Sequence, residues 1–290
     1  MMKRVSKEQR VNTYSAKHPP AIRIGPGETF IMETNDRFQG YTSPEDAPLD
    51  MLLSMTGPVY VAGTQPGDTL SVEILDIKPA VGYGWIVATP GRAVLKDRVH
   101  EWRRRKVMLE GDRVWFNERI SFPYAPMIGR MGVAPEGEAK PSNSVGPFGG
   151  AMSNTAVGPG ATVYLPVFVE EALLTIEDVH AAMGDGESAT SAVEMAAEVT
   201  LRVDIATHLQ VERPLVITRD ALMTTGEGST MEVASRMAVD EMATLLMGRL
   251  GLDAVDAAML VSVAVDARFS YIGGAPYRAK AIIPRSLLGL

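Results

Sequence analysis

The sequence contains no cysteine and only four histidines among its 290 residues. The lack of cysteine excludes disulfide scaffolds, thiolate metal sites and cysteine nucleophiles. No uninterrupted apolar stretch reaches the ~20 residues that a membrane-spanning helix needs. Residues 1–16 are polar and charged, unlike the apolar core of a secretory signal. We therefore expect a cytoplasmic protein that does not insert into a membrane.

Basic residues are outnumbered by acidic ones. Lys and Arg total 28 against 35 Asp and Glu, and the net charge of −7 disfavours general nucleic-acid binding. The one basic cluster, Arg103 to Lys106, is short and flanked by acids, which favours a solvated turn or a subunit contact. Hydrophobic content of 46% and charged content of 22% are ordinary for a globular protein. The length allows one large domain or two smaller ones.

Glycine and proline are abundant and dispersed, which is typical of many turns between short strands. The pattern Pro-Gly-x-Thr-apolar occurs at residues 26–30, 66–70 and 159–163. Proline followed by glycine suits a type II turn, because glycine supplies the positive φ at its third position. Alternating apolar residues follow the first two turns, as in half-buried strands. The sequence therefore predicts a mainly β, β-sandwich-like fold.

The C-terminal part has a different character. A capping box at residues 229–232 and apolar residues at helical spacing predict a helix over residues 230–248. Asp253 would cap a second helix, completing a helical pair at about 230–265. The result is either one unit of residues 1–290 or two lobes that divide near residue 150. The other predicted elements are a hairpin at 22–34, an irregular or partly helical segment at 42–54, strands at 59–62 and 70–77, an aromatic loop at 82–85, a hairpin at 107–116, an irregular stretch at 123–150, and strands at 162–169, 193–209 and 277–284.

One stretch, residues 173–187, combines a histidine, four carboxylates and two glycines. If residues 174–180 form a strand, Asp178 and His180 lie on the same face. The following Gly-Asp-Gly-Glu loop would bring Asp185 and Glu187 back toward the strand end. One imidazole and several carboxylates suit a divalent metal or a general base. The alternative is a strand that ends in an ordinary turn, with surface carboxylates and a hydrogen-bonded structural histidine.

Residues 178–187, Asp-Val-His-Ala-Ala-Met-Gly-Asp-Gly-Glu, resemble the signature of the acetamidase/formamidase family. Further similar segments follow the order of that family over most of the chain. They are residues 26–36, 56–61, 66–70, 128–135 and 149–152. The resemblance implies the fold of this family and hydrolysis of short amides or lactams, and its members commonly associate into homo-oligomers.

The resemblance also implies a set of site residues. His180, Asp36 and Asp178 would hold a divalent metal, with Zn²⁺ favoured by the histidine and Ca²⁺ or Mn²⁺ left open by the carboxylates. Glu187 or Asp185 would take a proton from water and pass it to the leaving nitrogen. Simpler structural roles remain open for two of these residues, since Asp36 could cap its loop and Asp185 could serve the Gly-Asp-Gly turn.

Three positions depart from the family pattern. Ala151 and Ser153 stand where the family has Asn and Asp, and Glu177 replaces a glycine. A serine is a weaker metal ligand than an aspartate, so an alternative is a catalytically impaired member that serves as a small-ligand binding protein or scaffold. Ser142, Ser144 and Ser153 have no partner base in the sequence pattern, so a serine nucleophile is disfavoured.

Overall fold

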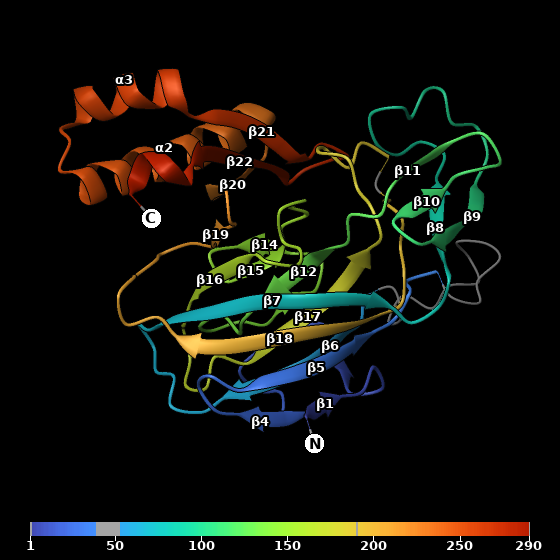
Figure 1. Ribbon diagram of the computed structural model, residues 1–290, viewed down its shortest axis with the longest axis horizontal. Helices are drawn as coiled ribbons and strands as arrows, with labels where there is room; N and C mark the ends of the chain where they lie inside the picture. Colours follow the sequence, from blue (N-terminus) through green and yellow to red (C-terminus); the bar gives the residue numbers. More distant parts are fainter. Residues whose placement is uncertain (1, 39–52, 190, 290) are drawn as a thin grey trace.

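The computed structural model describes residues 2–38, 53–189 and 191–289, and most of the predicted segment at 42–54 lies outside these ranges (Figure 1). The largest sheet of the described residues has nine strands. In spatial order its strands are β1 (Lys3–Val5), β5 (Thr29–Thr34), β18 (Ala197–Ile205), β7 (Thr69–Pro79), β16 (Thr162–Pro166), β19 (Leu215–Ile217), β20 (Ala221–Gly228), β22 (Tyr277–Pro284) and β21 (Asp266–Tyr271).

A second large sheet faces part of the first. Its strands are β14 (Val145–Gly146), β15 (Gly149–Ala151), β12 (Met127–Gly132), β17 (Leu174–His180), β6 (Met55–Val61) and β2 (Arg10–Val11), and β4 (Ile22–Ile24) also pairs with β6. A smaller sheet contains β11 (Ser121–Pro123), β10 (Arg113–Trp115), β9 (Arg103–Glu110) and β8 (Tyr83–Ala88), and β13 (Lys140–Pro141) pairs with β3 (Thr13–Tyr14).

The two large sheets share one hydrophobic core. Alternate residues of β5 and β18 are buried, including Phe30, Met32, Val199 and Leu201, and they join buried residues of β6, β12 and β17. Two sheets that pack face to face around one core form a β-sandwich layer. The continuous burial of β12 and β17 means that their other face is covered as well. The predicted mainly β, sandwich-like class is therefore confirmed.

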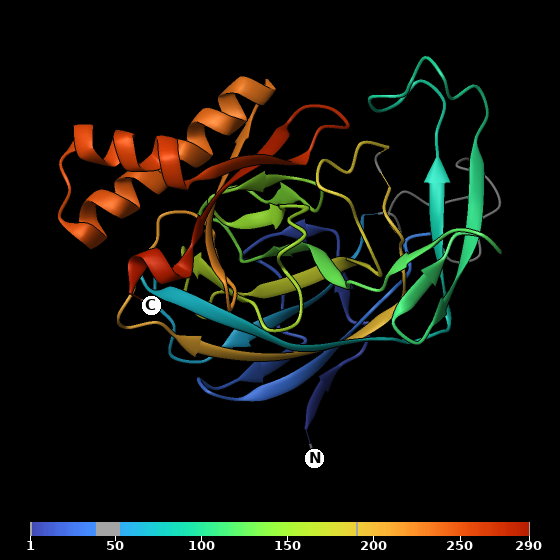
Figure 2. The ribbon, with the colours of Figure 1, turned by 45° about the horizontal axis from the view of Figure 1, so that its top comes forward.

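The predicted helical pair is also present. α2 (Met231–Leu250) and α3 (Ala254–Ala264) begin at Thr230 and Asp253, whose side chains accept backbone N–H groups of the first turn. α2 covers β20 and β22 and forms a second core with them, centred on Ala238 and Met242 (Figure 2). A 3₁₀ turn, Arg285–Leu288, closes the described chain. None of the described helices is long and apolar enough to cross a bilayer.

The three Pro-Gly turns form where the sequence predicts them. Gly27, Gly67 and Gly160 have φ of 77°, 94° and 84°, and each turn precedes a strand. The hairpin predicted at 22–34 is wrong, however. β4 pairs in parallel with β6, whereas β5 pairs with β1 and β18, so the turn at Gly27 carries the chain from one sheet to the other.

Three regions that were predicted to be irregular, a loop or a turn contain strands. The expected aromatic loop at 82–85 lies mainly in β8, and the expected basic turn at 103–106 lies in β9, its partner. The cations of β9 stack on aromatic rings, with Arg104 4.0 Å from the Trp85 ring centroid and Lys106 3.9 Å from that of Tyr83. The stretch at 123–150 contains β12, whose six residues are all buried. Glycine permits this packing, since a Cβ on Gly149 would lie 2.4 Å from the Met131 carbonyl oxygen.

Candidate active site

The site is built on β17, which lies between β12 and β6 and is buried along its whole length. Asp178 interrupts the regular pairing with β12, because its φ of 65° is left-handed. Its side chain nevertheless lies beside that of His180, with Oδ1 3.4 Å from His180 Nε2. The sequence therefore placed these two side chains together correctly, although the strand between them is not regular.

Glu194 completes this cluster, and the sequence did not lead us to predict it. Its Oε2 lies 3.2 Å from His180 Nε2, and an isolated β-bridge joins the two residues. Glu194 is 1% exposed. A signal was available, because this carboxylate interrupts an otherwise apolar run at residues 192–197, and buried acids without a function are rare.

The cluster has the chemistry of a divalent metal site. Asp178, His180 and Glu194 each offer one ligand atom, and these atoms lie within 4.8 Å of one another. Both ring nitrogens of His180 and Oε2 of Glu194 are buried without a hydrogen bond to any described residue. Buried polar atoms that form no hydrogen bond are costly, and an ion between them would satisfy them. One imidazole and two carboxylates are a donor set that Zn²⁺ accepts.

Charge compensation is strong around these residues. Burial opposes the charged imidazolium, but the carboxylates of Glu194 and Asp178 outweigh it and hold the pKa of His180 well above its usual value. Burial also opposes the Asp178 carboxylate, but Arg37, Arg130 and His180 hold its pKa well below the usual value.

The two arginines contact Asp178 directly, with Arg37 Nη1 2.9 Å from Oδ1 and Arg130 Nε 3.5 Å from Oδ2. Arg37 follows β5, and Arg130 belongs to β12. Neither residue was named from the sequence, because a lone arginine in a loop or strand gives no periodic signal.

Asp36 lies next to Arg37 but is not a member of the three-residue ligand group. It is buried, and its Oδ1 accepts a hydrogen bond from Phe38 N over 2.8 Å. This contact is the loop-capping role left open from the sequence. Burial raises the pKa of Asp36 to about 7. Its predicted role as a metal ligand stays a prediction.

The two acids of the glycine loop have different surroundings. Asp185 Oδ1 accepts hydrogen bonds from Lys280 Nζ over 2.6 Å and from Thr155 Oγ1 over 2.7 Å. Glu187 is buried, lines the main cavity and interacts with the Ser153 hydroxyl, and burial raises its pKa. Of the two predicted proton carriers, Glu187 therefore lies at the cavity and Asp185 has a structural partner, and the catalytic role of each stays a prediction.

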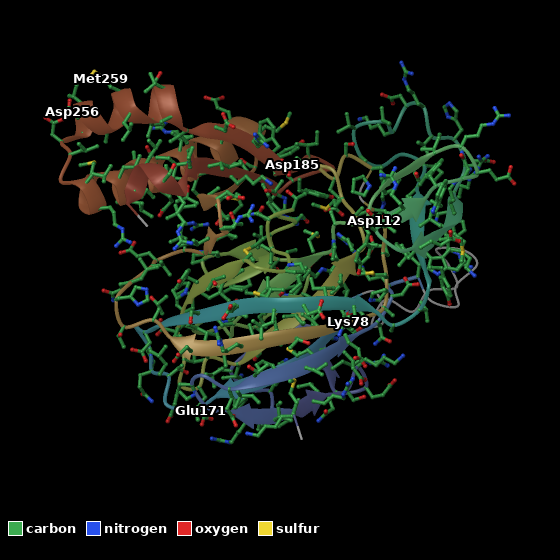
Figure 3. The ribbon with its side chains drawn as sticks, in the orientation of Figure 1. Lys78, Asp112, Glu171, Asp185, Asp256 and Met259 are labelled. Carbon is green, nitrogen blue, oxygen red and sulfur yellow. The ribbon has the colours of Figure 1, made fainter. Side chains whose placement is uncertain are left out.

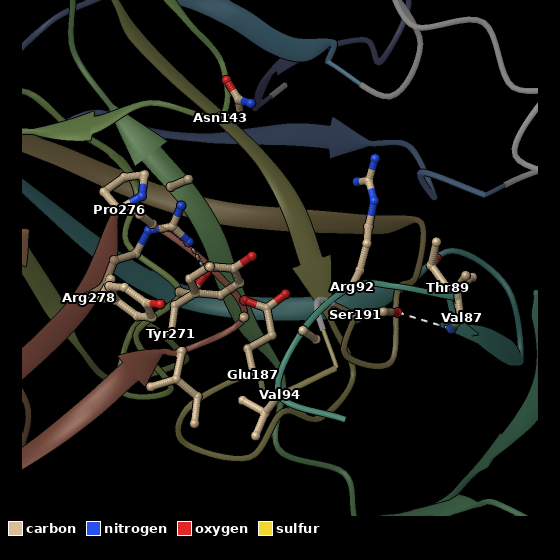
Figure 4. A pocket seen from close by; sticks show the side chains of 18 of the residues that line it. Val87, Thr89, Arg92, Val94, Asn143, Glu187, Ser191, Tyr271, Pro276 and Arg278 are labelled. Carbon is tan, nitrogen blue, oxygen red and sulfur yellow. Dashed lines mark hydrogen bonds between the residues drawn. The ribbon is translucent and has the colours of Figure 1, made fainter. Parts of the chain in front are cut away.

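A cavity of about 1160 Å³ opens over these groups. Asp178, Glu187 and Ser153 line it together with the loop after β21 and the first residues of β22 (Figure 4). Ala151 and Ser153, two of the three positions that depart from the family pattern, both line it. Glu177 points elsewhere and is buried, accepting the backbone N–H groups of Asn35 and Thr56.

A family model for the Acetamidase/Formamidase family matches residues 2–144 and 147–288. The chain belongs to this family. The acetamidase of Bacillus halodurans is 34% identical in sequence, and the superposition covers 99% of this chain and 100% of that one with a TM-score of 0.95. A structure described as a predicted acetamidase/formamidase from Thermoanaerobacter tengcongensis is 33% identical, with coverage of 100% and 97% and a TM-score of 0.93.

Curated relatives of the family are more distant and longer. The acetamidase of Mycolicibacterium smegmatis is 24% identical over 267 residues. That match covers 67% of this chain, and the chain spans 65% of the length of the relative. Such acetamidases and formamidases are amidases, enzymes that hydrolyse C–N bonds.

Proposed function

We propose that this acetamidase/formamidase family member hydrolyses the C–N bond of a small amide or lactam in the cavity above β17. The observation that carries the proposal is the buried group of Asp178, His180 and Glu194, with nitrogen and oxygen atoms that lack hydrogen bonds. Hydrolysis adds water across the bond, so that the carbonyl carbon becomes a carboxylate and the nitrogen leaves with a proton.

Asp178, His180 and Glu194 are the residues that would hold a divalent ion, with Zn²⁺ favoured over Ca²⁺ and Mn²⁺ by the imidazole. Such an ion supplies a Lewis acid for the amide carbonyl and for water. Arg37 and Arg130 restrain the Asp178 carboxylate and offset its charge. They thereby keep its oxygens fixed toward the cavity, which limits the reorganisation needed when substrate binds.

Glu187 is the residue best suited to move the proton. An amide nitrogen is a poor leaving group until it is protonated, so an acid beside it is needed. Burial raises the pKa of Glu187 and favours its protonated form, while its carboxylate form can accept a proton from water. The Ser153 hydroxyl interacts with Glu187 and helps to orient it.

Turnover measured after controlled metal loading tests this proposal. The protein is stripped with a chelator and reloaded with Zn²⁺, Ca²⁺ or Mn²⁺, and ammonia release is followed from formamide, acetamide and longer amides. We expect activity to return with Zn²⁺. Stoichiometric metal binding without turnover of any amide would instead favour the impaired binding or scaffold protein that Ala151 and Ser153 left open.

Self-association into a homo-oligomer is also part of the proposal. Val255, Met259 and Val263 recur every four residues on α3 and are 67%, 57% and 83% exposed, and Met259 points outward from α3 in Figure 3. Three apolar side chains on one helix face support an interface with a second copy. Light scattering tests this by measuring the molar mass in solution. A wild type that is monomeric, with the same mass as Val263→Lys, would contradict the interface.

A further inference from the structure

The cavity is rich in positive charge. Among its described lining residues, Arg37, Arg92, Lys96, Arg130 and Arg278 oppose only two carboxylates, Asp178 and Glu187. Its volume of about 1160 Å³ exceeds the upper range of ordinary small-ligand pockets, and formamide or acetamide would fill little of it. Both features favour a larger and negatively charged ligand.

Arg278 is the buried lining cation that forms no ion pair with a described residue, although the Glu187 carboxylate acts on it from beyond ion-pair distance. Arg37 and Arg130 contact Asp178, and Arg92 and Lys96 are exposed. The Arg278 side chain belongs to β22 and is buried, yet no carboxylate of the described chain lies within 4.0 Å of it. A buried guanidinium without an anionic partner is costly, which indicates that a ligand supplies one.

The contacts of Arg278 hold its guanidinium in place but leave several of its N–H donors without an acceptor among the described residues. Its centre lies 4.3 Å from the ring centroid of Tyr271, and Nη1 donates to Ser153 Oγ over 3.2 Å. Nε is buried without a hydrogen bond to any described residue. The planar guanidinium has five N–H groups, so donors remain for a carboxylate, which it binds best through two parallel hydrogen bonds.

The position of Arg278 relates it to the reacting groups. Figure 4 shows Arg278, Tyr271 and Glu187 beside one another in the cavity. Ser153 links them, since it accepts from Arg278 and interacts with Glu187. A short ligand could therefore place a carboxylate on Arg278 and an amide beside Glu187 at the same time.

We propose that the substrate is an amide that also carries a carboxylate, and that Arg278 binds this carboxylate. The proposal rests on the amidase function argued above and specifies its substrate class. Arg278 is then a specificity-determining residue. The carboxylate of the ligand forms the ion pair that the Arg278 guanidinium lacks among the described residues of the free protein.

Two probes of equal chain length test the proposal. Succinamate carries an amide and a carboxylate, and succinamide carries an amide at both ends. We expect wild-type kcat/KM to be at least about tenfold higher for succinamate, and this ratio to fall about tenfold or more in Arg278→Gln, since the charge-assisted hydrogen bonds between the guanidinium and the carboxylate are removed. Arg278→Lys should keep part of the preference.

Arg268→Gln is the matched control. It removes the same charge from the adjacent strand β21, but its side chain is exposed, pairs with Asp266 and does not line the cavity. The ratio should be unchanged in this variant. Equal wild-type activity on both probes, or an equal loss on both in Arg278→Gln, would overturn the carboxylate proposal while leaving the amidase function intact.

Binding of succinate measures the same site without turnover. We expect calorimetry to detect binding to the wild type, little or none to Arg278→Gln, and normal binding to Arg268→Gln. This pattern in a protein that hydrolyses no amide would support the anion site and refute the amidase function. Absence of succinate binding to the wild type, or undiminished binding to Arg278→Gln, would refute the anion site.

Discussion

Lys280 Nζ lies 2.6 Å from Asp185 Oδ1, so a strand of the C-terminal part holds the loop that carries Glu187. The same amine also donates to Asn154 Oδ1 and Thr155 Oγ1 over 3.2 and 2.8 Å. The Lys280 side chain is only 2% exposed, and burial lowers its pKa while Asp185 opposes that effect. Three acceptors around one buried amine fix two loops of the site against β22.

Replacement of Lys280 by Met should therefore destabilise the protein. The change leaves a partly buried carboxylate and two side-chain oxygens without their donor, at a cost of about 2–4 kcal/mol. Urea unfolding measures this cost. Asp185→Asn is the informative companion, because it keeps an acceptor for Lys280 and should cost less. If Asp185→Asn abolishes turnover but leaves stability unchanged, the result would favour a catalytic role for Asp185 over a structural one.

Loss of a single ligand should weaken metal binding. We expect His180→Ala and Glu194→Gln each to reduce Zn²⁺ affinity by about tenfold or more, because the first removes a donor from a three-residue site and the second replaces a charged carboxylate with a weaker, neutral amide. Elemental analysis and competition with a chelator provide the measurement. His208→Ala removes an exposed histidine and serves as the control. Full zinc content in Glu194→Gln would point back to the set predicted from the sequence, which includes Asp36.

Glu187→Gln should lower kcat more than it changes KM. The amide is nearly isosteric and keeps a hydrogen-bonding group, but it cannot carry a proton, and general acid–base catalysis contributes about 10²–10⁴ in rate. Steady-state kinetics on the best amide substrate measures both parameters. Retention of more than about a tenth of kcat would assign proton transfer to another group.

Asp36 should make stability depend on pH. Its pKa is about 7 in the folded protein against about 4 in an unfolded chain, so the folded state binds the proton more tightly. The contribution of this group to stability is therefore present below pH 4 and is lost as pH rises toward 7, by about 4 kcal/mol at most.

Asp36→Asn removes this titration while keeping an acceptor for Phe38 N. With a chelator present, the unfolding free energy of the variant relative to wild type should rise between pH 5 and pH 8. A difference that is constant over this range would show that Asp36 titrates normally.

The contact between α2 and β20 depends on the lack of a side chain at Gly226. A Cβ there would lie 2.3 Å from Ala234 O and 2.5 Å from Ala238 N. Gly226→Ala should destabilise the protein by about 2–3 kcal/mol, since the helix must move away from the strand. Gly248→Ala, within α2 and with no atom within 4 Å of its Cβ, should be neutral or stabilising by up to about 1 kcal/mol. Thermal unfolding of both variants makes the comparison.

Local signals in the sequence predicted local structure well. The Pro-Gly turns, the hairpin with Gly111 and Asp112 at its tip, and the cap at Asp253 depend on residues within one turn of each other. The cap of α2 is Thr230, one residue after the Ser229 that the capping box predicts. Pairing between distant strands was not accessible in this way. The chain changes sheet at Gly27, because β4 pairs with β6 and β5 pairs with β18. Both partners lie far from Gly27 in sequence, so no local pattern predicted the change.

The candidate site was found in part for the same reason. Asp178 and His180 are two residues apart, so strand periodicity was sufficient to bring them together. Glu194, Arg130 and Arg278 reach the site through sheet pairing and loop packing, which no period in the sequence reveals. The family resemblance supplied Asp36 and assigned Glu187 its catalytic role. Glu194 gave a local signal as a lone acid in an apolar run, but its place in the cluster, like those of the missed arginines, needed coordinates.

The nine-stranded sheet continues from the large core into the smaller core beneath α2. The cavity is lined from β12 and β17, which pack in the large core, and from β22, which packs under α2. Heat should therefore melt both cores in one cooperative transition, although each has its own apolar interior. A ligand that contacts Arg278 on β22 and the groups near Asp178 on β17 would act as a bridge between them. Its binding would then stabilise both cores together, because neither core could unfold without releasing the ligand.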